Sequence, residues 1–201
     1  MVCLDHPQTH PVSEWRYSMP NTSRFSLAAT AAFALSALLA GFTPQAQAAS
    51  NPLIEPRVLI VDPAAQADAA VQAARRYGTF WATGNEELAR EALAPQFMDR
   101  TLPPGRAQGV EGPLAASKAF RAAVPDLDCQ IEQMIVAGDR VVAHLRFTGH
   151  FSGQFQGIKG KGQPIDFIAT DIYRIANGRI QENWHIEDNL TLLQQLGVVG
   201  A

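Results

Sequence analysis

The periodicity of apolar residues changes once along this chain, near Pro125, and this change constrains the fold more than any other feature. Before it, residues 68–82 repeat apolar side chains at spacings of three and four, which predicts a helix. Shorter helices are expected at 86–93 and 112–123. After it, four segments alternate as strands do: 129–137, 140–150, 165–175 and 179–188. Helices followed by strands predict an α+β domain, in which the helices cover one face of a curved antiparallel sheet.

The first 49 residues have the pattern of a secretory signal. Residues 25–42 form an uncharged apolar run, and a polar segment with alternating small residues follows at once. This arrangement predicts cleavage rather than a stable membrane anchor. The residues before Met19 are unlike a targeting signal, so translation is expected to start at Met19. The protein is therefore predicted to be exported, either to the periplasm or out of the cell.

The rest of the chain is expected to form one domain. Residues 50–66 contain three prolines and are predicted to be an extended lead-in, followed by the domain itself at 67–201. The chain carries 16 Lys and Arg against 19 Asp and Glu, and no basic cluster stands out, which argues against a nucleic acid as partner. Cys129 is the only cysteine outside the predicted signal region, so an intrachain disulfide is excluded in the processed protein.

Several segments occur in an order and spacing that resemble one known family. They are WATGN from Trp81, APQFMDR from Ala94, AFRAAVPDL from Ala119, AGDRVVAHLRFTGHFSGQFQGI from Ala137, DIYRIANGRIQENW from Asp171 and LLQQLG from Leu192. Together they resemble the SnoaL-like polyketide cyclases and ester cyclases of the nuclear-transport-factor-two-like superfamily. The resemblance covers residues 70–197, nearly the whole predicted domain.

The resemblance implies a cone-shaped α+β barrel with an internal pocket, often dimeric, that needs neither a metal nor an organic cofactor. Cyclases of this family close a ring by intramolecular aldol condensation of a polyketide ester, in which one polar side chain takes a proton from carbon. Aligning the family's R-x-x-x-G-[KR]-I pattern, which begins here at Arg174, puts its catalytic Asp position at His185 and its His position at Asp171. The two residue types are exchanged.

Asp171 and His185 are therefore the predicted catalytic pair. An acid between apolar strand neighbours is costly unless it is paired, exposed or used, and Asp171 stands between such neighbours. A histidine has an ordinary pKa of about 6.5, close to working pH, so His185 can accept a proton while an ionised Asp171 orients it and steadies the imidazolium.

The turn at Asn177-Gly178 decides whether the pair shares a face, because side chains alternate along a strand. In a two-residue type I′ turn, Asp171 lies opposite Trp184 and His185 points away. In a three-residue loop with a bulge at its glycine, Asp171 lies opposite Asn183, one diagonal step from His185. We favour the bulged register. It gathers Asp171, Tyr173, Asn183 and His185 on one face, and Ile168, Ile172, Ile180, Trp184 and Ile186 on the other.

Aromatic and polar side chains near the pair are the candidates for binding a substrate. They are Trp81, Phe97, His144, Phe147, Phe167, Tyr173, Trp184 and Asp188. Structural alternatives stand beside these roles: the aromatic residues can belong to the core, and Asp188 can cap a last helical turn. Two functions remain open. One is an exported cyclase or isomerase that uses the His/Asp pair on a small apolar carbonyl or ester substrate, and the other is a non-catalytic protein that binds a small apolar ligand.

Overall fold

The computed structural model describes residues 52–62 and 67–200, so the predicted signal region lies outside the described residues. The elements are β1 (Val58–Val61), α1 (Ala67–Thr83), α2 (Glu86–Ala92), β2 (Leu93–Asp99), α3 (Glu111–Ala123), β3 (Asp128–Ala137), β4 (Arg140–Phe151), β5 (Gln154–Phe155), β6 (Ile158–Lys159), β7 (Gln163–Ala176), β8 (Arg179–Glu187) and α4 (Asn189–Gln195). The predicted α+β class is confirmed, and each expected helix and strand is present with bounds within two residues of those expected. None of the helices described here combines the length and hydropathy that crossing a membrane requires.

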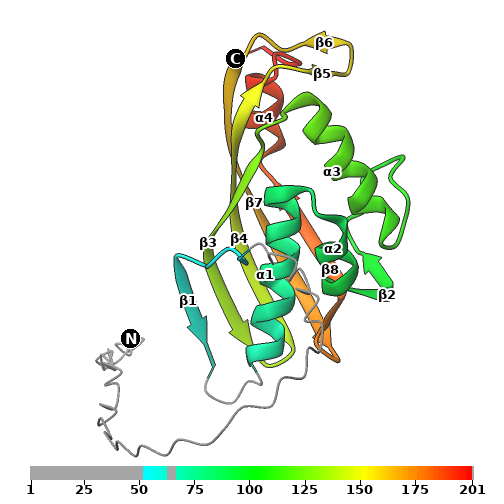
Figure 1. Ribbon diagram of the computed structural model, residues 1–201, viewed down its shortest axis with the longest axis vertical. Coiled ribbons are helices and arrows are strands. Elements are labelled where there is room, and N and C mark those ends of the chain that lie inside the picture. The colour runs from blue at the N-terminus through cyan, green and yellow to red at the C-terminus, as the bar shows by residue number, and fades with distance from the viewer. Residues whose placement is uncertain (1–51, 63–66, 201) are drawn as a thin grey trace, which may run out of the picture. The chain divides into compact units, whose positions relative to one another are not determined.

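The main sheet has six strands in the order β1-β3-β4-β7-β8-β2. Its four central strands are antiparallel, as expected, but both edge strands run parallel to their neighbours. The apolar pattern of the sequence did not predict the two edge strands. Strand β1 is only four residues long, and β2 contains Pro95, which is tolerated in an edge strand but weakens a strand pattern. The sheet is curved and open, and helices α1, α2 and α3 lie on one side of it (Figure 1).

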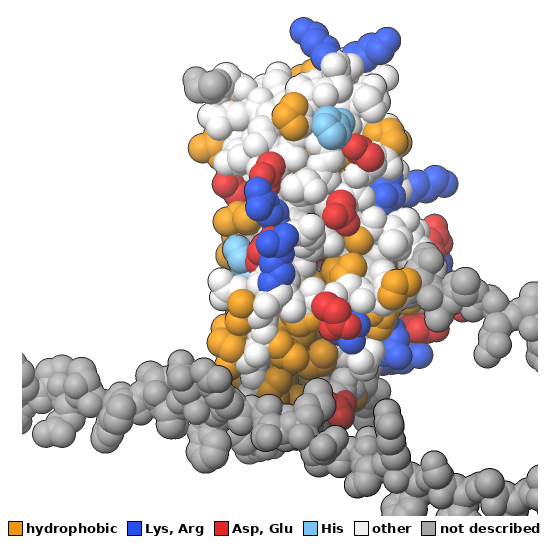
Figure 2. Space-filling view, turned by 60° about the vertical axis from the view of Figure 1, so that its left-hand side comes forward, with side chains coloured by type: hydrophobic (Ala, Val, Ile, Leu, Met, Phe, Trp, Pro, Cys, Tyr) orange, Lys and Arg blue, Asp and Glu red, His pale blue; other side chains and the backbone are white. Residues whose placement is uncertain are grey.

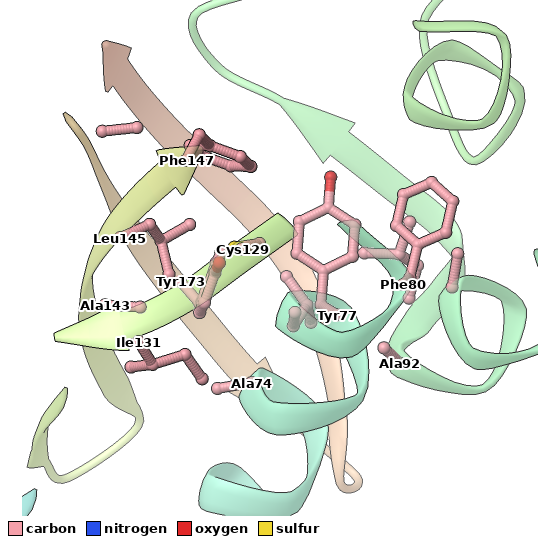
Figure 3. Packing of buried hydrophobic residues seen from close by; sticks show 14 of the residues in the cluster. Ala74, Tyr77, Phe80, Ala92, Cys129, Ile131, Ala143, Leu145, Phe147 and Tyr173 are labelled. Carbon is pink, nitrogen blue, oxygen red and sulfur yellow. The ribbon is translucent and has the colours of Figure 1, made fainter. Parts of the chain in front are cut away.

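Helix α1 packs directly on the concave face of the sheet. Its buried side includes Ala70, Ala73, Ala74, Tyr77 and Phe80. Gly78 allows the close approach, because a Cβ there would stand 3.1 Å from the Ile131 side chain. The ring of Tyr77 meets that of Tyr173 edge-on at 5.9 Å, which joins the helix to the centre of β7 (Figure 3).

The β7–β8 hairpin corrects the expected turn. Asn177 and Gly178 both have positive φ, 53° and 69°, as a two-residue type I′ turn requires. Ala176 consequently pairs with Arg179. The three-residue loop favoured from the sequence is therefore wrong.

A bulge further along β8 nevertheless brings the predicted pair together. Gln181 has no partner between the paired residues Ile180 and Glu182, so the rest of β8 is shifted by one residue. Asp171 then lies directly opposite His185. Ile180, expected to face outward, is buried because it lies on the turn side of the bulge. The four residues predicted to share the inner face do share it.

Candidate active site

A cavity of about 720 Å³ lies among α1, α3, α4 and the concave face of the sheet. Much of its wall is aromatic and aliphatic, and includes Trp81, Phe120, Phe147, Phe155, Phe167 and Leu192. The rings of Phe147 and Phe167 stack with centroids 5.1 Å apart, and Trp81 meets Phe147 edge-on at 6.2 Å. Such a wall favours a flat or ring-bearing apolar compound. The connection between β4 and β7 reaches the cavity through Phe155 and Gln156.

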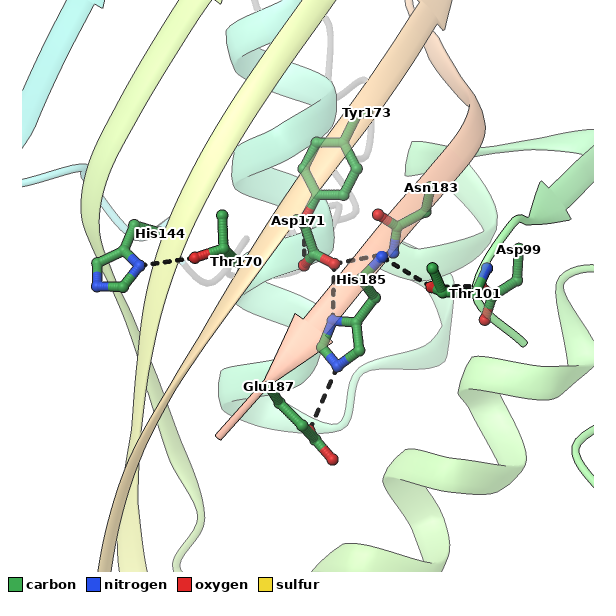
Figure 4. Close-up of polar contacts among 9 residues, drawn as sticks. All are labelled: Asp99, Thr101, His144, Thr170, Asp171, Tyr173, Asn183, His185 and Glu187. Carbon is green, nitrogen blue, oxygen red and sulfur yellow. Dashed lines mark hydrogen bonds and ion pairs between the residues drawn. The ribbon is translucent and has the colours of Figure 1, made fainter. Parts of the chain in front are cut away.

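The polar part of the cavity wall is built around Asp171 and His185. Nδ1 of His185 lies 2.8 Å from Oδ1 of Asp171. The Asp171 side chain is 2% exposed and that of His185 is 24% exposed, so the carboxylate forms the floor and the imidazole stands nearer the open space (Figure 4). The structure brings the predicted pair into hydrogen-bonding contact in the cavity.

Asp171 has two further donors. The hydroxyl of Tyr173 donates to Oδ2 at 2.9 Å, and the Nδ2 amide of Asn183 donates to Oδ1 at 2.9 Å. Because an ionised carboxylate only accepts hydrogen bonds, three donors around it offset the cost of burying its charge. Burial, followed by the charge of Asp171, raises the pKa of Tyr173 well above its ordinary value, so the tyrosine remains a donor.

His185 has a second acidic neighbour, which sequence reasoning missed. Nε2 of its ring lies 3.3 Å from Oε2 of Glu187, two residues along β8. Since both carboxylates accept, these two contacts need an N–H on each ring nitrogen, which means an imidazolium. Alternation along β8 could have identified Glu187, because residues two apart share a face.

The electrostatics agree with a charged ring. Burial lowers the pKa of His185, but the hydrogen bonds and charges of Asp171 and Glu187 outweigh burial and raise that pKa to about 10. His185 is thus a cation at neutral pH and holds no free lone pair. This raised pKa differs from the near-ordinary value assumed from the sequence. The catalytic role of His185 stays a prediction.

The loop after β2 holds the backbone of His185 in place. The backbone N–H of His185 donates to Oγ1 of Thr101 at 2.8 Å, and the backbone N–H of Thr101 donates to Oδ1 of Asp99 at 2.9 Å. Asp99 and Arg106 from this segment also line the cavity. The sequence did not identify these residues, because no local pattern shows which strand the segment after β2 covers.

The other predicted binding residues divide between the cavity and the remainder of the fold. Trp81, Phe147 and Phe167, three of the candidates for binding a substrate, line the cavity. Phe97 is buried in the core, and Tyr173 lies behind Asp171 rather than at the cavity surface.

Three candidates lie away from the cavity. His144 faces the outer side of the sheet, where its Nδ1 contacts Oγ1 of Thr170 at 2.9 Å. Trp184 is also on the outer side, with the guanidinium of Arg140 5.5 Å from its ring centre. Alternation along the strands explains both positions. The residues next to His144 on β4 and next to Trp184 on β8 face the inner side of the sheet, so His144 and Trp184 face the outer side. Asp188 is the N-cap of α4 and accepts from the Thr191 amide at 3.1 Å, which confirms the structural alternative.

The acidic residues of the site are not arranged around a common point. Asp171 and Glu187 contact opposite nitrogens of the His185 ring, so the three groups do not converge. Within residues 52–62 and 67–200, no group of three or more His, Cys, Asp or Glu side chains is placed to hold a metal ion.

Comparisons with known proteins agree with the fold. A family model described as SnoaL-like polyketide cyclase matches residues 71–196. The crystal structure of a protein proposed to be a polyketide cyclase, from Bacillus cereus, is 42% identical, with a TM-score of 0.67, covering 74% of this chain and 95% of that one. IdmH from Streptomyces antibioticus, also proposed to be a polyketide cyclase, is 28% identical, with a TM-score of 0.58 and coverage of 65% and 99%. TsrD from Streptomyces laurentii is 27% identical, with a TM-score of 0.59 and coverage of 65% and 96%. A search of curated proteins finds no significant match.

Proposed function

The chain belongs to the SnoaL-like polyketide cyclase family, and from that premise we propose that it is a cyclase or isomerase acting on a small apolar carbonyl or ester compound. The observation that carries the proposal is the Asp171–His185 pair, whose Oδ1 and Nδ1 atoms lie 2.8 Å apart at the polar wall of an otherwise largely apolar cavity. A largely buried ion pair of this kind is a preorganised electrostatic environment, because its charges are already oriented before the substrate arrives.

The pair acts on the oxygen of the substrate in this proposal. Asp171 holds the ring through Nδ1 and stabilises its positive charge, while the opposite edge of His185 stands nearer the open space. When a carbon next to a carbonyl loses its proton, negative charge develops on the carbonyl oxygen, and the imidazolium of His185 stabilises that charge. In a ring closure the enolate carbon then attacks a second carbonyl, and the new alkoxide takes a proton from His185.

A bicyclic ketone tests this function without knowledge of the natural substrate. The probe is 2-tetralone, whose aromatic ring suits the wall of Trp81, Phe147 and Phe167 and whose methylene protons next to the carbonyl exchange with D2O. Proton NMR follows the exchange rate. We expect the wild-type protein to accelerate exchange at least about 100-fold over buffer, and His185→Gln to lose most of that gain. His144→Gln, which changes a histidine on the other side of the sheet, should leave the rate unchanged.

The same experiment separates the two functions that the sequence left open. Binding of 2-tetralone is followed by quenching of tryptophan fluorescence, since Trp81 lines the cavity. Binding without accelerated exchange would overturn the enzymatic proposal and favour a non-catalytic protein that binds small apolar ligands.

We also propose that the protein is exported, to the periplasm or beyond the cell. Support comes from the apolar run at residues 25–42 and the small residues that follow it. N-terminal sequencing of the exported protein should find a start between Ala46 and Asn51. A protein that retains Met1 or Met19 would contradict this.

A homodimer formed through the outer face of the sheet is a further part of the proposal. Five apolar residues lie side by side across five strands there: Ile60, Ile135, Val142, Ile172 and Trp184. Ile60 is 53% exposed and Ile172 is 41% exposed. Figure 2 shows apolar side chains gathered on the lower part of the side nearest β1 and β3. A row of this kind, with exposed apolar side chains on β1, β3 and β7, is typical of a surface that another protein covers.

A further inference from the structure

Glu187 has fewer hydrogen-bond partners than the other acidic groups of the cavity. Its side chain is 29% exposed and lines the cavity. Its partner within the described residues is His185, which it contacts through Oε2. Directly across the sheet stands Ala169, whose methyl group offers no hydrogen bond. The Oε1 atom of Glu187 is therefore available to a bound molecule.

Asp171 is a poor proton acceptor by comparison. Its side chain is 2% exposed, and it already accepts from Tyr173, Asn183 and His185. Adding a proton to it would set an O–H group among three donors and remove the charge that they stabilise.

The remaining candidates for a proton acceptor are also weaker than Glu187. Both ring nitrogens of His185 face carboxylates and carry protons, so the ring has no lone pair to offer. Asp99 accepts from the backbone N–H and the hydroxyl of Thr101 through Oδ1, which ties it to its own loop.

We propose that Glu187 is the base that takes the proton from the substrate carbon, while His185 is the acid that serves the oxygen. This rests on the proposed function and assigns its proton acceptor. In the first step the carbon–hydrogen bond breaks, its proton passes to Oε1 of Glu187, and its electron pair forms the enolate beside the His185 cation. In the second step the enolate carbon bonds to a second carbonyl carbon, and the resulting alkoxide takes a proton from Nε2 of His185.

The carboxyl group of Glu187 lies beside Nε2 of His185, with Oε2 3.3 Å from it in the resting protein. The carboxyl group turns to bring its protonated oxygen to Nε2, and the proton passes to the neutral ring of His185, so that the carboxylate and the imidazolium are both regenerated. No proton is gained or lost overall, and the product is an isomer of the substrate. Asp171 remains ionised throughout as the positioning group that holds the ring.

The test uses Glu187→Gln and Glu187→Asp in the 2-tetralone exchange experiment. Glutamine keeps the size and can still accept from His185 but cannot take a proton from carbon, whereas aspartate keeps the carboxylate. We expect Gln to lower the exchange rate at saturating 2-tetralone at least about 100-fold with little change in the fluorescence-measured dissociation constant. Asp should restore part of the rate. The control is Glu91→Gln, which removes a carboxylate of α2 that pairs with Arg76 away from the cavity and should leave the rate unchanged.

Each outcome decides something different. If wild-type protein exchanges and Glu187→Gln exchanges equally fast, Glu187 is not the base, and the proposed function stands without it. If Gln and Asp are equally slow while binding is retained, Glu187 only positions His185, and the inference is overturned. If the wild-type protein itself does not exceed the buffer rate, the proposed function is overturned first.

Discussion

His185 and His144 make nearly the same contact on opposite faces of the sheet. Each points Nδ1 at a side chain of β7, at 2.8 Å to Asp171 and 2.9 Å to Thr170. The two partners are neighbours in sequence and face opposite ways because strand side chains alternate. Of the two, the inner histidine meets carboxylates, which raise the pKa of His185 to about 10.

The comparison shows that the partner and the surroundings decide what a histidine can do. On the inner face, the carboxylates of β7 and β8 contact both ring nitrogens of His185, and their effect on its pKa outweighs the cost of burying a cation. On the outer face, the ring of His144 meets a hydroxyl, which can both donate and accept. A histidine in a strand pattern is therefore a candidate only once its face is known.

The largest difference is expected from changing the two partners on β7. Asp171→Asn removes the buried charge that three donors surround and turns an amide toward them. It should lower the free energy of unfolding by about 3 kcal/mol and abolish accelerated exchange. Thr170→Val should change the free energy of unfolding and the exchange rate little. Urea unfolding measures the stability of the two variants, and the 2-tetralone assay measures their exchange rates. Equal losses of stability and exchange in the two variants would show that the two faces of the sheet do not differ in this respect.

The second difference lies in the pH dependence of stability. The pKa of His185 is about 10 when folded, against an ordinary value of 6.5. Because the pKa of His185 is higher in the folded than in the unfolded protein, the protonated ring stabilises the fold. This contribution to stability is fully present below pH 6.5 and is lost as pH rises through 10. Its charged neighbours in the cavity are Asp171 and Glu187. Thermal unfolding should show a melting temperature that falls over this window in wild type and in His144→Gln, and a flatter curve in His185→Gln.

Much of this site followed from local pattern and resemblance. Helix and strand periods placed Asp171 and His185 on adjacent strands, and the resemblance made the pair a prediction. The bulge at Gln181 could not be read locally, because β8 is paired on both sides and its register with β2 also shifts there. For this reason the sequence predicted correctly that Asp171 and His185 share a face, although the turn from which this was argued was wrong.

The residues around the pair were harder to predict for a related reason. Glu187 follows His185 by two places, so alternation could have identified it once the face was known. His144 and Trp184 were assigned to the pocket from residue type alone, and their faces depend on registers set by neighbouring strands. Asp99 reaches the site through the parallel pairing of β2 with β8, where it pairs with Asn183, 84 residues later in the chain, and no short pattern records such a contact.

A smaller effect is expected from the hydroxyl behind the carboxylate. Tyr173→Phe removes one of three donors to Asp171 and leaves the ring contact with Tyr77 in place. The loss of one hydrogen bond to a charged group should lower the free energy of unfolding by about 2 kcal/mol and reduce exchange far less than Asp171→Asn. Unchanged stability would show that Asn183 and His185 suffice to hold the buried charge.

The smallest effect on the exchange rate is expected from the outer face, where the same sheet is apolar. Ile172 lies between Val142 and Trp184 in the exposed row, and its neighbour in sequence, Asp171, faces the cavity. Ile172→Glu puts a charge into the proposed dimer contact, where it would be desolvated without a partner, so sedimentation velocity should show a monomer. Ile172→Val keeps the row apolar and should remain dimeric. Exchange of 2-tetralone should be unchanged in both. If Ile172→Glu remains a dimer, the dimer contact lies elsewhere. If it becomes a monomer and no longer accelerates exchange of 2-tetralone, the dimer contact on the outer face is needed for the activity of the cavity.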